Sequence, residues 1–124
     1  MNTNINDLLK KLPDYEDFMT LADSIELTSK EKARLEIQIK TLETELVKKV
    51  TTDPTYFQSG KVPSMVYIES TWKYTGLDNE LLPLRLRFSE LTAELEKSKI
   101  KMDIYKTMLD IWRTLSANER KASI

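Results

Sequence analysis

Residues 84–116, LRLRFSELTAELEKSKIKMDIYKTMLDIWRTLS, carry the strongest structural signal in this chain. Apolar side chains recur throughout the stretch at alternating spacings of three and four residues. That spacing keeps one face of an α-helix apolar and is typical of the contact seam of a coiled coil. Because the stretch contains neither glycine nor proline, we expect one long helix over residues 78–117, with Asp78 as its N-cap and Pro83 near its start.

The same spacing occurs a second time over residues 14–51. Asp14 is followed three residues later by Asp17, and such a pair suits the first turn of a helix. Residues 28–31 (TSKE) match a capping box, so a single helix and a helix that breaks near Thr28 are both open. The apolar seam positions of the two stretches are Phe18, Leu21, Ile25, Leu35, Ile39, Leu42, Leu46, Leu84, Phe88, Leu91, Leu95, Met102, Tyr105, Leu109 and Trp112.

Residues 52–77 form a connector whose composition differs from that of both stretches. The connector contains both glycines of the chain and five of its ten aromatic residues. The β-branched and aromatic residues at 65–68 and 71–75 favour a small β-hairpin. A short helix that begins after Ser64 and ends at Gly76 is the alternative, and the sequence leaves both open.

The distribution of charge predicts that the two helices pair in an antiparallel arrangement. Residues 14–27 contain five acidic and no basic residues, whereas residues 97–121 contain seven basic and three acidic ones. Residues 28–50 contain six basic and four acidic residues, and residues 78–96 contain two basic and five acidic ones. An antiparallel pair places each negative segment beside a positive segment.

The sequence therefore predicts an all-α fold in which residues 1–124 form a single domain. We expect a long antiparallel coiled-coil helical hairpin with a short aromatic-rich connector, which is a β-hairpin in one of the two interpretations. A short N-terminal helix or arm over residues 1–13 precedes the hairpin, and a polar tail over residues 118–124 follows it.

A second apolar stripe on the C-terminal helix predicts that the chain associates with itself or with an obligate protein partner. The stripe lies roughly 120° from the seam around the helix. Since one partner helix covers one stripe, the second stripe needs a further surface. The alternative is that residues 1–12 fold back over the stripe. The stripe consists of Ile100, Ile104, Met108, Ile111 and Leu115.

The composition excludes several classes of function. The chain contains no Cys and no His, so disulfides, Ser-His triads and nearly all zinc sites are excluded, and two glycines leave no phosphate-binding loop. We expect no enzyme activity, no catalytic or metal-binding residues and no cofactor. No apolar run approaches the ~18 residues of a membrane span, and no secretory signal is recognisable. We therefore expect a cytoplasmic protein with no membrane partner.

Nucleic acid is the alternative partner. Basic residues gather in the C-terminal helix, where they would contact phosphates. The same positive charges could instead balance the acidic segment at residues 14–27. The sequence leaves open both interpretations, phosphate contact and charge balance within the chain. The candidate contacts are Lys97, Lys99, Lys101, Lys106, Arg113, Arg120 and Lys121.

The connector also has two interpretations. Its aromatic and basic side chains could form a recognition tip for a partner, or the aromatic rings could form the small core that closes the open end of the hairpin. The residues concerned are Tyr56, Phe57, Lys61, Tyr67, Trp72, Lys73 and Tyr74.

The order of helix, β-capable connector and helix resembles a prefoldin subunit, with residues 56–61 (YFQSGK) where a hairpin would begin. The basic stretch from Lys97 to Lys106, with Tyr105-x-x-Met108-Leu109, is similar to small phage recombination-mediator proteins. Our first expectation is a non-enzymatic helical assembly or adaptor protein that acts through an oligomeric coiled-coil interface. The similarity to phage recombination-mediator proteins implies a nucleic-acid-binding accessory protein of recombination or replication. The resemblance to a prefoldin subunit implies a holdase chaperone.

Overall fold

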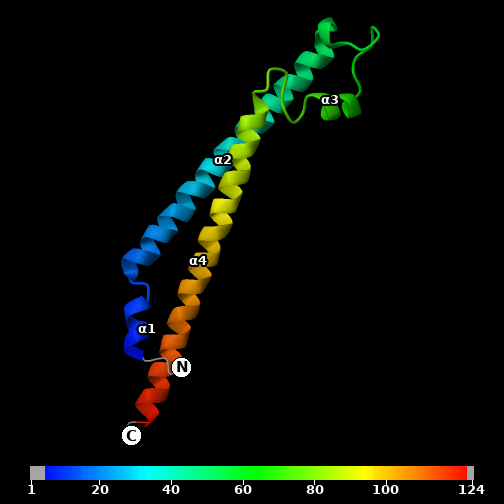
Figure 1. Ribbon diagram of the computed structural model, residues 1–124. Helices are drawn as coiled ribbons and strands as arrows, with labels where there is room; N and C mark the ends of the chain where they lie inside the picture. The colour runs from blue at the N-terminus through cyan, green and yellow to red at the C-terminus, as the bar shows by residue number, and fades with distance from the viewer. Residues whose placement is uncertain (1–4, 123–124) are drawn as a thin grey trace. The chain divides into compact units, whose positions relative to one another are not determined.

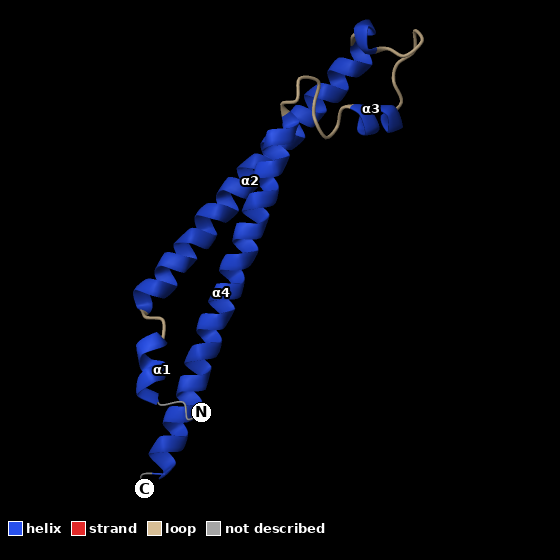
Figure 2. Ribbon diagram, in the orientation of Figure 1, coloured by secondary structure: helices blue, strands red, loops and turns tan. Residues whose placement is uncertain are grey.

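The computed structural model describes residues 5–122, and every regular element in that range is helical. The elements are α1 (Ile5–Lys11), α2 (Tyr15–Thr52), the 3-10 helix η1 (Pro54–Tyr56), α3 (Met65–Thr71) and α4 (Leu81–Ala122) (Figure 1). Figure 2 shows helices and loops only, and no strand occurs among the described residues. The prediction of an all-α protein is therefore confirmed.

Two aspartates fix the start of α2. The backbone N–H of Asp17 donates to Oδ1 of Asp14 at 2.8 Å, and the backbone N–H of Asp14 donates to Oδ2 of Asp17 at 2.9 Å. This reciprocal pair satisfies two N–H groups that the first turn leaves without helical partners. The helix then runs through Thr28 without a break, because no glycine or proline interrupts it and the capping-box pattern at residues 28–31 lies inside a continuous helix.

The start of α4 differs from the sequence prediction. The helix begins at Leu81, so Asp78 lies ahead of it rather than at its N-cap. The carboxylate of Glu80 accepts hydrogen bonds from the backbone N–H groups of Leu77 at 3.2 Å and Asp78 at 2.7 Å. These bonds hold the turn before α4, and Pro83 falls within the first helical turn, where its missing N–H is tolerated.

The end of α4 also differs from the prediction. We expected the helix to end near Ala117, but it continues to Ala122. Asn118 does not stop the helix, because the next residues, Glu119-Arg120-Lys121-Ala122, all have high helix propensity and no glycine or proline follows within the described range. The polar tail that we expected from residue 118 is thus helical up to residue 122.

The chain packs as two units. Residues up to Thr28 and residues from Glu94 onward form one, the terminal unit, and Ser29–Ala93 form the other, the connector unit. Both α2 and α4 contribute to each unit, and the border on α2 falls after Thr28, within the capping-box pattern of residues 28–31. The connector unit contains η1 and α3, and the terminal unit contains α1.

The connector unit holds the main hydrophobic core. Its buried side chains come from the second part of α2, from α3 and from the first part of α4. Full burial of such a side chain stabilises the folded state by about 1.5–3 kcal/mol, so this cluster is the principal source of hydrophobic stabilisation in the unit. The buried cluster consists of Leu35, Ile39, Leu46, Val50, Ile68, Leu81 and Leu91.

Arg85 ties three segments of the connector unit together. Its guanidinium contacts the carboxylate of Glu43 on α2 and donates to the backbone carbonyl of Lys73 at 2.7 Å. Its Cζ also lies 5.4 Å from the centre of the Tyr74 ring. Both hydrogen bonds come from Nη2, so one end of the guanidinium links α2 to the segment that follows α3.

The connector folds around a short helix, so the β-hairpin interpretation is wrong. Oγ of Ser64 accepts a hydrogen bond from the N–H of Tyr67 at 3.2 Å and caps α3. Pro63 has no N–H to donate to a ladder, which disfavours a strand at this point. Within the connector, backbone pairing of the β type is limited to an isolated antiparallel bridge between Gln58 and Lys61, across a tight turn. The β-capable connector on which the prefoldin resemblance rests therefore contains the short helices η1 and α3, joined by loops, and no strand.

The terminal unit is more sparsely packed. Among its described residues, Leu21 on α2 and Leu95 on α4 are the buried hydrophobic side chains. The rings of Phe18 and Tyr105 meet edge to face with centroids 5.5 Å apart. α2 and α4 thus contact each other in this unit, but they enclose a much smaller core than the connector unit does.

Candidate interaction surface

The second apolar stripe of α4 lies in the terminal unit, and its isoleucines face solvent. Ile100 is 53% exposed, Ile104 is 52% exposed and Ile111 is 48% exposed, whereas Met108 and Leu115 are half-buried. The alternative cover, residues 1–12, lies partly outside the residues whose side chains the structure describes. In that segment, Leu9 is itself 44% exposed.

The seam positions behave differently from the stripe. Every apolar seam position on α2 and α4 is buried or half-buried. In the terminal unit these are Phe18, Leu21, Ile25, Leu95, Met102, Tyr105, Leu109 and Trp112, and in the connector unit they are Leu35, Ile39, Leu42, Leu46, Leu84, Phe88 and Leu91. The two apolar faces of the C-terminal part of α4 are therefore distinct, and the seam face is the better covered of the two.

Two polar positions of the seam are occupied by lysines that lie over aromatic rings. Nζ of Lys32 is 5.1 Å from the centre of the Phe88 ring, and Nζ of Lys49 is 5.8 Å from the centre of the Tyr56 ring. Each cation faces the negative face of a π system, which is an attractive arrangement. Both lysines fall at the three-and-four spacing of the seam, and the sequence alone does not indicate that aromatic rings contact them.

The basic residues of α4 divide between two faces. Lys99, Lys106, Arg113 and Arg120 recur every seven residues and so share one face, where all four are exposed. Asp103 and Asp110 lie along the same side of the helix, and Arg113 is 3.6 Å from Asp110. This face therefore alternates in sign rather than forming a purely basic stripe, and Lys121 is exposed near the end of the helix.

The other two lysines lie beside the acidic part of α2. A groove of about 350 Å³ in the terminal unit is lined by Lys97 and Lys101 from α4 and by Asp17 from α2. Nζ of Lys101 also lies 5.7 Å from the centre of the Tyr105 ring. This placement agrees with the interpretation that Lys97 and Lys101 balance the charge of the acidic segment. The two lysines lie on a different face of α4 from Lys99 and Lys106.

The connector brings three of its aromatic residues into one cluster. The ring of Trp72 meets Tyr67 edge to face at 5.3 Å and Tyr56 at 5.8 Å between centroids. All three rings and Phe57 are half-buried, whereas Tyr74, Lys61 and Lys73 are exposed. Trp72 and Tyr56 pack against the core of the connector unit, so these rings extend that core.

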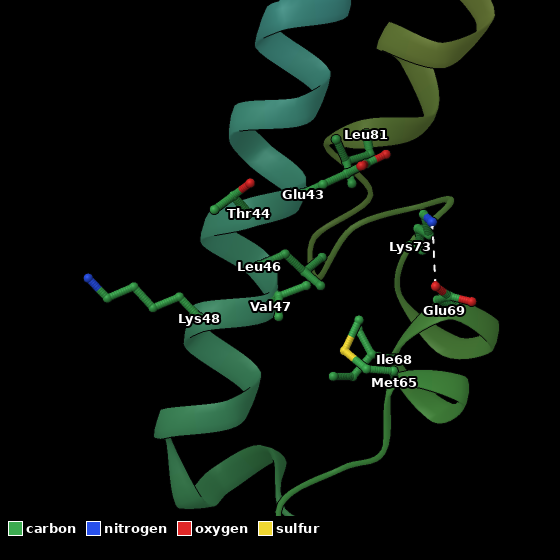
Figure 3. Close-up of a pocket in the computed structure, with 10 residues that line it drawn as sticks. All are labelled: Glu43, Thr44, Leu46, Val47, Lys48, Met65, Ile68, Glu69, Lys73 and Leu81. Carbon is green, nitrogen blue, oxygen red and sulfur yellow. Dashed lines mark ion pairs between the residues drawn. The ribbon is translucent and has the colours of Figure 1, made fainter.

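A pocket of about 430 Å³ lies between α2 and α3, at a position that the sequence did not single out. Figure 3 shows Met65 and Ile68 of α3 facing Leu46 and Val47 of α2, while the Lys48 side chain points away. Apolar side chains of both helices line the pocket together with charged side chains, among them Glu43, Glu69 and Lys73. The sequence signal that could have indicated the pocket is Val47, an apolar residue one position off the seam.

Two carboxylates of the connector unit, those of Asp53 and Glu80, accept hydrogen bonds from backbone groups. Asp53 accepts the N–H of Thr55 at 3.0 Å, and this hydrogen bonding, with nearby Lys49, holds its pKa below the ordinary value. For Glu80, desolvation raises the pKa, but hydrogen bonds from backbone N–H groups and the charge of Lys49 outweigh it and lower the pKa overall. Both groups are therefore stabilised as anions that cap local turns.

Within residues 5–122, no helix has an apolar segment that would cross a lipid bilayer. The same residues contain no group of three or more acidic, His or Cys side chains arranged to hold a metal ion. Comparison of the sequence and structure with protein-family models, with curated proteins and with solved structures gives no match.

Proposed function

We propose that this protein is a non-enzymatic helical assembly or adaptor protein. Its active surface is the apolar stripe of α4 from Ile100 to Leu115, which binds a second copy of the chain. The observation that carries the proposal is the exposure of Ile100, Ile104 and Ile111 on a helix whose seam face is already engaged.

The sparse packing of the terminal unit supports the proposal. This unit encloses Leu21 and Leu95, whereas the connector unit encloses a cluster of seven buried side chains. Covering three half-exposed isoleucines on each of two copies would contribute on the order of 5 kcal/mol before the entropic cost of association. Association therefore supplies the terminal unit with hydrophobic burial that its own residues do not provide.

Within this proposal the two long helices form an antiparallel coiled-coil hairpin. In the terminal unit Phe18 contacts Tyr105, and in the connector unit Nζ of Lys32 lies over Phe88. Nη2 of Arg87 is 3.0 Å from Oε1 of Glu31. Each of these pairs joins α2 to α4. Together they support a seam between the two helices, and the side of α4 that carries Ile104 lies outside this seam, where a partner can bind.

Solution mass tests the proposal. We expect light scattering to give an oligomer for the wild-type protein, and we expect the double variant Ile104→Asp/Ile111→Asp to be monomeric with most of its helical circular dichroism retained. The matched control is Lys106→Asp, which changes the net charge by the same two units on the opposite side of the helix. A wild-type protein that is monomeric at high micromolar concentration would overturn the proposal.

A second candidate function is nucleic-acid binding, and one observation favours it. Four basic residues share an exposed face at seven-residue intervals, from Lys99 to Arg120. The interleaved Asp103 and Asp110 reduce the positive potential of that face, so we place this function second. Titration with single-stranded DNA at about 50 mM and 200 mM salt tests it, because phosphate contacts weaken steeply with salt. Undetectable binding at the lower salt concentration would remove this candidate.

A further inference from the structure

The exposed stripe has a heptad register of its own, separate from that of the seam. When Ile104 and Ile111 are taken as a positions, Ile100 occupies a d position, and the half-buried Met108 and Leu115 fall at e. The residues at g are all acidic. The full register over this span is Lys97, Ile104 and Ile111 at a; Ile100, Thr107 and Thr114 at d; Lys101, Met108 and Leu115 at e; and Glu96, Asp103 and Asp110 at g.

This register decides between the two orientations in which two copies of the stripe can meet. In an antiparallel pair, g positions face g positions, so Asp103 of one copy would lie near Asp110 of the other. Like charges in that position destabilise the pair. In a parallel pair, g of one copy faces e of the next heptad on the other, which places Glu96 opposite Lys101 twice in a symmetric dimer. The e positions that follow are apolar. The like-charge contact that remains is Lys97 at a, which meets its own counterpart at the end of the stripe, where a long lysine side chain can extend its ammonium into water.

We infer that the stripe binds the same stripe of a second copy in a parallel, in-register dimer, with the two-fold axis parallel to α4. The inference rests on the proposed function and names the partner surface and its orientation. In such a dimer each a residue meets its own counterpart, so Ile104 packs on Ile104 and Ile111 packs on Ile111. β-branched isoleucine at a is one of the features that favour two-stranded parallel packing.

The attractive pair has no substitute within one chain. Glu96 and Lys101 are five residues apart, so they do not face each other on the surface of a single helix. In the single chain Nζ of Lys101 lies over the ring of Tyr105 and lines the groove beside Asp17. Because Lys101→Glu alone also alters these contacts within one chain, the readout for contacts between copies is the affinity regained when Lys101→Glu is combined with Glu96→Lys.

Cysteine crosslinking tests the orientation, and the natural chain is well suited to it because it contains no Cys. In a parallel in-register dimer, each of the variants Ile104→Cys and Ile111→Cys places its cysteine opposite the same cysteine of the other copy. The two Cα atoms then lie near the separation that a disulfide spans, about 5.5–6 Å. We expect each variant alone to form a covalent dimer under mild oxidation. Lys106→Cys is the control, since it lies away from the stripe and should remain uncrosslinked.

A mixture of the two variants separates the orientations. Positions 104 and 111 are about 10 Å apart along the helix, so a parallel dimer gives the two homodimeric crosslinks and no mixed one. A mixed 104–111 crosslink, or the absence of crosslinks in a protein that is dimeric by mass, overturns the inference and leaves the proposed function standing. A monomeric wild-type mass overturns both.

Charge exchange gives a second readout. At low salt we expect Glu96→Lys to weaken the dimer roughly fivefold or more, and we expect the double variant Glu96→Lys/Lys101→Glu to restore the wild-type dissociation constant. Asp103→Lys is the comparison, because its counterpart at e in a parallel dimer is Met108 and no ion pair is lost. Failure of the double variant to restore affinity overturns the parallel register.

Discussion

A Cβ atom placed on Gly76 would lie 2.3 Å from the carboxylate of Glu80. The close approach exists because this carboxylate turns back to accept the N–H groups of Leu77 and Asp78 ahead of α4. Gly76 has a φ of +82°, in the left-handed region that favours glycine. One glycine and one glutamate thus set the path by which the chain leaves the connector and enters α4.

We predict that Gly76→Ala lowers the free energy of unfolding by about 1–2 kcal/mol. Alanine is strained at this φ, and its methyl group displaces the Glu80 carboxylate from two hydrogen bonds. Urea denaturation at one fixed protein concentration measures the effect. Gly60→Ala is a useful comparison because Gly60 also has a positive φ, +76°, but nothing lies within 4 Å of an added Cβ. Equal losses in the two variants would mean that contact with Glu80 contributes nothing.

The same carboxylate predicts a loss of stability in acid. The folded-state pKa of Glu80 lies below its ordinary value of 4.5, so the anion stabilises the folded protein above that pH. Stability should decline as the pH falls below about 4.5 and through the lowered folded-state pKa. Asp53 has a lowered pKa as well and should add to the decline from its ordinary 3.8 downward.

The variant Glu80→Gln isolates the contribution of Glu80 to this pH dependence. The amide can still accept a hydrogen bond but does not titrate, so the unfolding free energy of the variant should fall less steeply between pH 5 and about pH 3. Chemical denaturation at a series of pH values gives both curves. Parallel curves for the wild type and the variant would contradict the assignment.

Ser64 should be required for α3 to form fully. We predict that Ser64→Ala costs about 1 kcal/mol, because the N–H of Tyr67 loses the side-chain oxygen that caps the helix. Hydrogen exchange of the α3 amides should accelerate accordingly. Ser70→Ala is the matched control, since Oγ of Ser70 only donates to the carbonyl of Tyr67 from an exposed position. An effect of equal size in both variants would exclude the capping explanation.

Local signals in the sequence predicted much of this fold. Leu84, Leu91 and their neighbours at spacings of three and four indicated the helices, and Asp14 with Asp17 indicated where α2 begins. These features depend on residues close to one another in the chain, so periodicity and capping chemistry are sufficient to reveal them.

Features that depend on contacts between distant residues were not predictable in the same way. The choice between a helix and a hairpin at residues 65–71 depends on the local Ser64 cap and also on burial of Ile68 in the core, and local propensity does not encode that burial. Lys32 is tolerated at a seam position because its ammonium lies over the ring of Phe88, a residue 56 positions further along the chain. The exposed stripe was recognisable as apolar, but its exposure depends on what the rest of the chain leaves uncovered.

Two leucines of α4 provide a test of where the stability of the connector unit lies. Leu91 is fully buried and Leu86 is 58% exposed, although both lie on the first part of the same helix. We predict that Leu91→Ala lowers the free energy of unfolding by about 2–5 kcal/mol, because the substitution leaves a cavity that the neighbouring core cannot fully close. The change from Leu86 to Ala should stay within about 0.5 kcal/mol, because its side chain is mostly in water in both states. Thermal and urea unfolding of the two variants at the same concentration make the comparison, and a small effect of Leu91→Ala would show that the core is not packed as described.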